Sequence, residues 1–301
     1  MSDPGDRTDG RTGVRTSKPP APASLEARAS LARLEAVVAE LDSVAVGLSG
    51  GVDSSLLAAV CSRVLGGAAV AVVARSPSLP ARELDGALAV AGRIGIDVEV
   101  VDTAEVADAR YAANPRNRCR FCKDHQFAAL REVADRRGLH SLAHGEVLDD
   151  LDDHRPGRAA AAEWGMRAPL REAGLDKTAV RALAHELDLP VWDKPAFACL
   201  ASRIPTGETV TPAKLARIEA AEQALYELGF RAFRVRHHDE LARVELPAAD
   251  LARAVAQREA IVAGVQEAGY DHVTLDLGGL REEASPPVES GRLLPVVGSP
   301  A

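Results

Sequence analysis

Short apolar runs alternate with helical patterns through the first half of the chain, and this alternation constrains the fold more than any other feature. Four runs rich in Val and Ala lie at 43–49, 68–75, 97–103 and 141–146. Helical patterns are found at 25–41, 53–66, 80–94 and 120–137. Strands that alternate with helices in this way predict an α/β fold, an open parallel sheet with helices on both faces. Such sheets bind ligands at the carboxyl ends of their strands.

The pattern changes in the second half of the chain. Residues 147–170 are predicted to be irregular, and Asp176 is expected to cap a helix that ends near Leu187. The stretch 190–207 has three prolines and no period, which is typical of a long functional loop. A smaller α+β module is then predicted, with a helix, two hairpin strands, a helix and a strand at 212–229, 230–238, 241–247, 248–268 and 272–279.

These patterns divide the chain into four parts. We expect a disordered tail at 1–24 and an α/β domain at 25–204. A C-terminal α+β domain at 205–282 and a second disordered tail at 283–301 follow. Both tails are rich in Gly, Pro and Ser and lack an apolar period.

The charge of the chain disfavours a nucleic-acid partner. The formal net charge is −8, whereas proteins that bind nucleic acid usually carry a basic surface. No apolar run approaches the roughly 18 residues of a membrane span. Residues 1–24 lack the apolar core of a secretory signal, so we expect a cytoplasmic protein. In that reducing compartment a Cys-x-x-Cys pair indicates metal binding or catalysis more than a disulfide.

The sequence LSGGVDSS at 48–55 joins the first predicted strand to a predicted helix. Its glycines allow close approach to an anion, and the helix N-terminus and hydroxyl groups can donate to that anion. No Gly-Lys-Ser/Thr follows, so the loop is not of the Walker A type. A plain glycine turn is the structural alternative. The residues expected to bind a nucleotide are Ser49, Gly50, Gly51, Asp53, Ser54, Ser55, Gly145 and Arg155.

The segment SGGVDSS resembles the PP-loop of the ATP pyrophosphatase superfamily. The resemblance implies an adenine nucleotide alpha hydrolase-like fold with ATP and Mg²⁺ as cofactors. It also implies that ATP is cleaved between its α and β phosphates, so that a carbonyl or carboxylate group is adenylated and a nucleophile then displaces AMP. The loop does not identify the nucleophile.

Two of the four cysteines, Cys119 and Cys122, form a Cys-x-x-Cys pair in NPRNRCRFCKDHQF at 114–127. Cys61 lies on the apolar face of a predicted helix and is expected to be a buried thiol. Cys199 lies in the 190–207 loop near Lys194, and a cationic neighbour favours the thiolate. If the loops converge at the sheet edge, three thiolates suit a [4Fe-4S] cluster with one free iron. Zinc with His125 as a further ligand and scattered structural thiols are the alternatives.

The chain as a whole is similar to the LarE family of ATP-dependent sulfur transferases. Beside the phosphate loop, the resemblance rests on NPRNRCRFCK, DDHRPGRAA, CLASRIPTGE, FRVRHHDELARVELP and VTLDLGG. It implies that a carboxylate of a pyridinium dicarboxylate mononucleotide is activated by ATP and converted to a thiocarboxylate. This reaction belongs to the biosynthesis of the nickel-pincer nucleotide, the cofactor of lactate racemase. The family also suggests a homo-oligomer.

Members of this family differ in their cysteines. Some have one active-site cysteine, matching Cys199, and give up its sulfur. Others have three and resemble cluster-dependent enzymes. This chain keeps Cys119, Cys122 and Cys199, so the resemblance implies that these three are catalytic residues and ligands of a [4Fe-4S] cluster that delivers sulfur. One departure is that the chain reads LREEAS after VTLDLGG, where the family usually has Phe-Arg-Ser-Gly; Arg281 is retained.

Arginines in the second module are candidates for substrate binding. Arg234 and Arg236 are two positions apart and share one face of a predicted strand. Guanidinium groups suit the phosphate and carboxylates of the implied substrate. A solvated strand face that pairs with acidic residues is the alternative, and His237 and His238 are expected at the surface. The residues expected to bind substrate are Arg203, Arg234, Arg236, Arg243 and Arg281.

Other functions remain open from the sequence. A tRNA thiolase shares the phosphate loop, but the acidic balance disfavours it. An amide-forming synthetase of the GMP or NAD type would use ammonia and would not need the thiols. A non-catalytic metal protein that senses ATP would bind nucleotide without releasing AMP.

Overall fold

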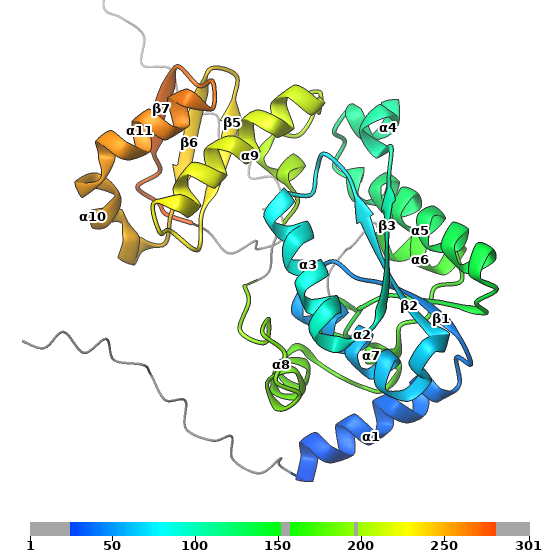
Figure 1. Ribbon diagram of the computed structural model, residues 1–301. Coiled ribbons are helices and arrows are strands. Elements are labelled where there is room, and N and C mark those ends of the chain that lie inside the picture. The colour runs from blue at the N-terminus through cyan, green and yellow to red at the C-terminus, as the bar shows by residue number, and fades with distance from the viewer. Residues whose placement is uncertain (1–24, 152–156, 196–197, 281–301) are drawn as a thin grey trace, which may run out of the picture.

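The computed structural model describes residues 25–151, 157–195 and 198–280. Its larger sheet has four parallel strands in the order β3-β2-β1-β4 (Figure 1). The strands are β1 Val44–Gly47, β2 Ala69–Arg75, β3 Asp97–Asp102 and β4 Ser141–Ala143. The chain moves outward from β1 to β3 and then returns to the other side of β1, so the strand order reverses between β1 and β4. Ligands of open α/β sheets bind at such a reversal.

Helices cover both faces of this sheet. Val44 and Val46 of β1 pack with helices on one face, while Ala45 packs with Phe127 and other residues on the opposite face. This follows from the alternation of side chains along a strand. The first face is covered by α1 Leu25–Ala39, α2 Val52–Leu65, α3 Ala81–Ile94 and α8 Lys177–Glu186. The second is covered by α5 Arg118–Arg137 and α6 Gly157–Glu163. The predicted fold class is confirmed.

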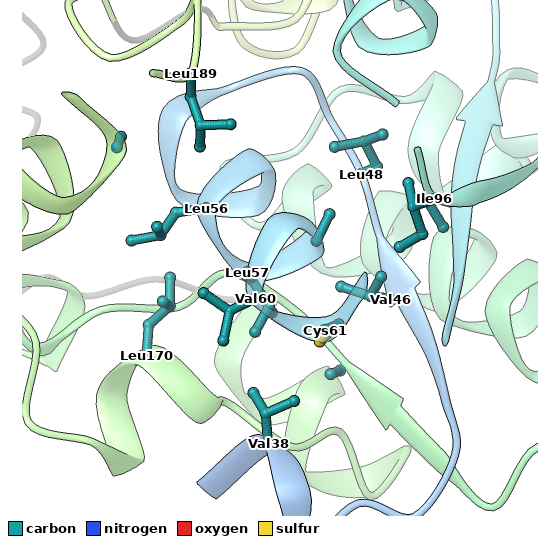
Figure 2. Close-up of a cluster of buried hydrophobic side chains, with 14 of the residues drawn as sticks. Val38, Val46, Leu48, Leu56, Leu57, Val60, Cys61, Ile96, Leu170 and Leu189 are labelled. Atoms are coloured by element: carbon teal, nitrogen blue, oxygen red, sulfur yellow. The ribbon is translucent and has the colours of Figure 1, made fainter. Parts of the chain in front are cut away.

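The buried face of α2 contains Cys61. Figure 2 shows its sulfur among apolar side chains that include Val38, Val46 and Val60. Cys61 has no exposed surface, and burial raises the pKa of its thiol to about 12. The expectation of a buried structural thiol is therefore confirmed.

A second sheet has three strands in the order β5-β6-β7. Strands β5 Arg234–His238 and β6 Leu241–Glu245 form the predicted antiparallel hairpin, and β7 His272–Leu275 pairs with β6 in parallel. Helices α9 Pro212–Glu227, α10 Ala248–Ala256 and α11 Arg258–Glu267 pack against it around a separate apolar core. Thr211 caps α9 by accepting from the N–H of Lys214 at 3.2 Å, and Pro212 takes the first helical position.

Two sequence expectations need correction. The single helix expected at 248–268 is two helices that meet at Gln257. Most residues between 255 and 260 are exposed, so no packing holds a continuous helix across them. The segment 147–170 is not wholly irregular, because it contains α6 and the first residues of α7 Pro169–Glu172. The remaining short helix is α4 Ala109–Ala112.

Over the described ranges, no helix combines the length and the apolar character that crossing a bilayer requires. The predicted tails at 1–24 and 283–301 lie outside the described residues.

Candidate active site

The loop after β1 wraps around the N-terminus of α2. Gly50 has φ +73°, a left-handed conformation that glycine adopts readily. Ser54 accepts from the N–H of Ser49 at 3.1 Å and donates to the carbonyl of Gly51 at 3.1 Å. These bonds bring the loop over the positive end of the helix dipole, which is a favourable place for phosphate.

Gly145 lies after β4 and touches the same helix end. A Cβ atom at this position would lie 2.8 Å from the backbone nitrogen of Ser54. Only glycine allows this approach, and it brings the ends of β1 and β4 together at the reversal of strand order. Gly145 was expected among the nucleotide-binding residues, and it lines the same cavity as Ser54.

Two lysines that the sequence did not single out for the nucleotide lie beside this loop. Lys177, at the start of α8, forms an ion pair with Asp53. Lys194 donates to the carbonyl of Gly50 at 3.1 Å and to Glu83 at 2.7 Å. Lys194 was expected beside Cys199, but its ammonium group is held at the phosphate loop. Both lysines are more than 100 residues away from the loop in the sequence, so their contacts with it could not be predicted from local patterns.

A buried carboxylate also lines the cavity. Glu146 is 6% exposed and pairs with Arg171 at 2.5 Å and Arg158 at 3.1 Å. Next to it, His144 is largely buried, and burial lowers the pKa of its imidazole to about 4. The sequence HGE at 144–146 gave no indication that Glu146 would be buried and paired with two arginines.

One cavity of about 480 Å³ joins the phosphate loop to the cysteines. Ser49, Gly51, Asp53 and Ser54 line one part of it, and the residues that line other parts include Cys122, Cys199, Lys123, Gln126 and Gly145. The expected convergence of the phosphate loop with two of the three cysteines is therefore seen in the structure. Ser55 is fully buried and is not among the lining residues.

The three cysteines differ in exposure. Cys119 is exposed, whereas Cys122 and Cys199 are half-buried and pack against one apolar cluster with Tyr111 and Leu200. Burial, with the nearby Cys199, raises the pKa of the Cys122 thiol to about 12. Among the described residues, the three sulfur atoms do not meet the 4.8 Å mutual spacing of a single-ion site. His125, the further ligand in the zinc alternative, pairs through its Nε2 atom with Asp108 at 3.2 Å.

A network of hydrogen bonds holds the Cys199 loop against the start of α5. Asn114 donates to the carbonyl groups of Ile204 at 3.3 Å and Pro205 at 2.8 Å. Arg118 donates to the carbonyl of Ala201 at 2.9 Å, and its other terminal nitrogen lies 3.9 Å from the sulfur of Cys199. The cation beside this thiol is thus Arg118, which comes from the Cys-x-x-Cys helix and not from the loop.

The arginines of the second module do not line the cavity in the described part of the chain. Arg236 donates to Glu245 at 3.0 Å and to the carbonyl of Ser202 at 2.9 Å. Arg243 also pairs with Glu245, at 3.1 Å. Arg234 is half-buried on the same strand face as Arg236, as its spacing predicted.

Arg203 requires a correction. It was expected to bind substrate, but its side chain is 2% exposed and forms an ion pair with the fully buried Glu222 at 2.7 Å. The guanidinium group is enclosed, so it can hold the loop but offers no surface to a ligand. Arg155 and Arg281, expected at the nucleotide and the substrate, lie outside the described residues.

Comparison with known proteins agrees with this site. Residues 27–138, which include the phosphate loop and the Cys-x-x-Cys pair, match the NAD synthase family. An uncharacterised protein of Synechocystis is 45% identical over 83% of this chain and 94% of its own length. An uncharacterised protein of Methanocaldococcus jannaschii is 24% identical over 78% of this chain and 89% of its own length.

A further relative has a named activity. The pyridinium-3,5-bisthiocarboxylic acid mononucleotide synthase of Lactiplantibacillus plantarum is 37% identical over 83% of this chain and 91% of its own length. Identity at this level over most of the chain confirms the resemblance that the motifs indicated. The chain belongs to the family of this synthase, the LarE family.

Proposed function

We propose that this chain is an ATP-dependent sulfurtransferase that converts a carboxylate of a pyridinium dicarboxylic acid mononucleotide to a thiocarboxylate. The observation that carries the proposal is the shared cavity, in which the phosphate loop faces Cys122 and Cys199. An adenylating site and a sulfur-delivering site must adjoin, because the activated carboxylate has to meet the sulfur before water does. The named relative makes a product of this class.

The phosphate loop suits the first step. A carboxylate oxygen attacks the α phosphorus of ATP, the bond to the bridging oxygen breaks, and pyrophosphate leaves. Backbone amides at the start of α2, with Lys194 and Lys177 beside them, offset the charge that develops on the leaving group.

Asp53 is suited to hold the Mg²⁺ that accompanies ATP. Its Oδ1 atom is buried and has no hydrogen-bond partner within the described ranges, while its other oxygen pairs with Lys177. A buried carboxylate oxygen without a donor is a natural ligand for a hard cation. Mg²⁺ held there would offset the negative charge of the ATP phosphates.

Cys119, Cys122 and Cys199 are suited to hold a [4Fe-4S] cluster. They come from two segments that Asn114 and Arg118 tie together, and two of them line the cavity. The raised pKa of Cys122 makes its free thiol a poor nucleophile, but metal binding removes a thiol proton outright. When bound, the cluster would supply sulfur as sulfide, the oxidation state that a thiocarboxylate requires. In the overall exchange, sulfide replaces AMP at the activated carboxyl carbon.

Finer features of the reaction belong to the same proposal. The substrate phosphate and second carboxylate are proposed to be recognised by Arg234, Arg236, Arg243 and Arg281. In the structure, Glu245 pairs with two of these, Arg236 and Arg243.

We also propose a cytoplasmic homo-oligomer, with the domain boundary at 204–205. One apolar cluster packs residues from both sides of this position together, among them Leu200, Ile204 and Leu215.

An amide-forming synthetase is the second candidate, because the NAD synthase family matches residues 27–138. That match ends before Cys199 and the second sheet. An amide-forming enzyme would keep full activity without thiols, so a Cys119→Ala/Cys199→Ala double variant separates the two functions.

The decisive experiment is anaerobic purification followed by assays of iron, sulfide, zinc and ATP turnover. We expect about four irons and at least four sulfides per chain. AMP and pyrophosphate should form only with the pyridinium substrate. Single alanine variants of Cys119, Cys122 and Cys199 should each lose the iron, whereas Cys61→Ala, which removes a thiol outside the site, should keep it. If zinc were found in place of iron, or if the three variants kept unchanged sulfur transfer, the proposed [4Fe-4S] cluster would be wrong. If tRNA stimulated AMP formation, the proposed pyridinium substrate would be wrong.

A further inference from the structure

A second group of metal-ligand side chains lies outside the cavity. Glu208, His237 and Asp239 each offer one ligand atom, and these atoms lie within 4.8 Å of one another. His237 is on β5 and Asp239 is in the turn that follows it. Glu208 belongs to the segment that runs from the Cys199 loop to α9. None of the three lines the cavity of about 480 Å³.

His237 is the observation that points to a ligand. It was expected at the surface, but it is 2% exposed. Its Nδ1 atom lies 3.0 Å from the hydroxyl of Tyr270, whereas Nε2 is buried and has no hydrogen-bond partner among the described residues. A buried ring nitrogen without a partner is costly, and most such atoms in proteins are satisfied by a bond, a water molecule or an ion.

The Tyr270 contact prepares Nε2 for this role. Tyr270 is 1% exposed, and its ring stands edge-on to the imidazole with 5.7 Å between the centroids. With the Nδ1 proton donated to the Tyr270 oxygen, the lone pair of the neutral ring lies on Nε2. Metal-binding histidines in proteins are commonly oriented by a partner on the second nitrogen in this way.

The surrounding charges can accommodate a cation. Lys214 pairs with Glu208 at 3.3 Å, but both side chains are about a quarter to a third exposed, so the ammonium group can move into solvent. Arg217 donates to the backbone carbonyl of Asp239 at 3.1 Å and leaves the carboxylate available on the exposed turn. Two carboxylates and one imidazole would therefore surround an ion that arrives from the open side.

We propose that Glu208, His237 and Asp239 bind one divalent transition-metal ion of the zinc and cobalt class. One nitrogen and two oxygen ligands suit such ions, whereas calcium and magnesium prefer oxygen alone. The ion would tie the segment before α9 to the β5–β6 hairpin. It is independent of the proposed sulfur transfer, because the ligand set contains no thiol and lies apart from the phosphate loop.

The test is titration of the full-length, metal-free protein with Co²⁺ in the absence of nucleotide. Cobalt bound by nitrogen and oxygen shows visible ligand-field bands without the near-ultraviolet sulfur-to-metal band that cysteine ligands produce. We expect one such equivalent in the wild type. Asp239→Asn and Glu208→Gln should each weaken it by at least about tenfold. Tyr270→Phe, which keeps all three ligands, should weaken it by about 10–100-fold.

Matched variants keep the test decisive. Glu240→Gln removes a neighbouring exposed charge and should leave cobalt binding unchanged. Asparagine tolerates the left-handed backbone of Asp239 (φ 51°), so Asp239→Asn should fold even if a change at the buried His237 does not. Zn²⁺ should raise the thermal midpoint of the wild type and of Glu240→Gln, but not that of Asp239→Asn. Absence of sulfur-free cobalt bands, or bands that persist unchanged in Asp239→Asn and Glu208→Gln, would overturn the proposal.

Discussion

Arg203 and Glu222 form an ion pair at 2.7 Å in which the two side chains are 2% and 0% exposed. Glu222 also pairs with Arg82 of α3 at 3.1 Å and accepts from the N–H of Val235 at 3.2 Å. One carboxylate on α9 therefore holds the cysteine loop, the first sheet's α3 helix and strand β5 together.

The first prediction concerns this buried pair. Glu222→Gln keeps the shape of the side chain but removes the negative charge of a buried ion pair with Arg203, which costs about 3–5 kcal/mol of unfolding free energy. Urea unfolding monitored by circular dichroism measures the loss. The matched control is Asp188→Asn, whose partner Arg93 and own side chain are exposed, and which should cost no more than about 1 kcal/mol. Equal losses in the two variants would contradict the structural role of Glu222.

Gly145→Ala should disable the phosphate loop. The new Cβ would press on the backbone nitrogen of Ser54, and backbone cannot move aside as a side chain can. We expect a loss of about 1–3 kcal/mol in unfolding free energy together with a large fall in AMP formation. In the control, Gly67→Ala, the added methyl group meets nothing within 4 Å. If Gly145→Ala turned over ATP at the wild-type rate, the close approach would have no part in nucleotide binding.

Acid stability should depend on His144. Burial lowers the pKa of its imidazole to about 4, whereas the unfolded chain has the ordinary value near 6.5. As the pH falls below 6.5, His144 takes up a proton in the unfolded state but stays neutral in the folded state. The stability that its low pKa contributes is therefore fully present above pH 6.5 and is lost between pH 6.5 and 4. At about pH 5 the loss amounts to about 2 kcal/mol.

Unfolding free energies at about pH 8 and about pH 5 give the measurement. His144→Gln should show a smaller difference between the two conditions than the wild type, while the exposed control His272→Gln should show the wild-type difference. A difference that is the same in all three proteins would rule out His144 as its source.

Thiol reactivity should separate the cysteines of the metal-free protein. With a pKa of about 12, about one Cys122 thiol in 10⁴ is ionised at pH 8, and the same holds for Cys61. Iodoacetamide should therefore modify the exposed Cys119 first and the other two more than about a hundredfold more slowly. Peptide mass spectrometry after timed labelling checks this order, and labelling in denaturant should make all four react. Equal rates at Cys119 and Cys122 in the folded protein would contradict the raised pKa of the Cys122 thiol.

Local patterns were sufficient for the architecture. The strand–helix alternation predicted the parallel sheet because β1 and most of β2 are short apolar runs buried on both faces, as Val46 and Ala45 illustrate. The phosphate loop could be read because glycine and serine act there through backbone geometry within eight residues. The break between α10 and α11 at Gln257 was not predicted, because the apolar spacing continues across it.

Contacts between distant segments could not be read in this way. Lys177 and Asp53 are 124 positions apart, and Arg203 reaches Glu222 on the following helix and not a ligand. His237 is buried because Tyr270, 33 positions later, covers it. Each of these charged or polar side chains has the same local sequence signature whether it faces solvent, a partner or a substrate.

The hydrogen bonds of Asn114 to Ile204 and Pro205 cross about 90 positions of sequence. During synthesis the Cys-x-x-Cys helix emerges long before the segment that carries Cys199, so the growing chain holds two of the three proposed cluster cysteines without the third. The order of biosynthesis therefore sets the order of maturation. Under the proposed function, iron and sulfide would be retained only after the chain beyond Pro205 has been made and has packed against Asn114, so the proposed cluster would be loaded late.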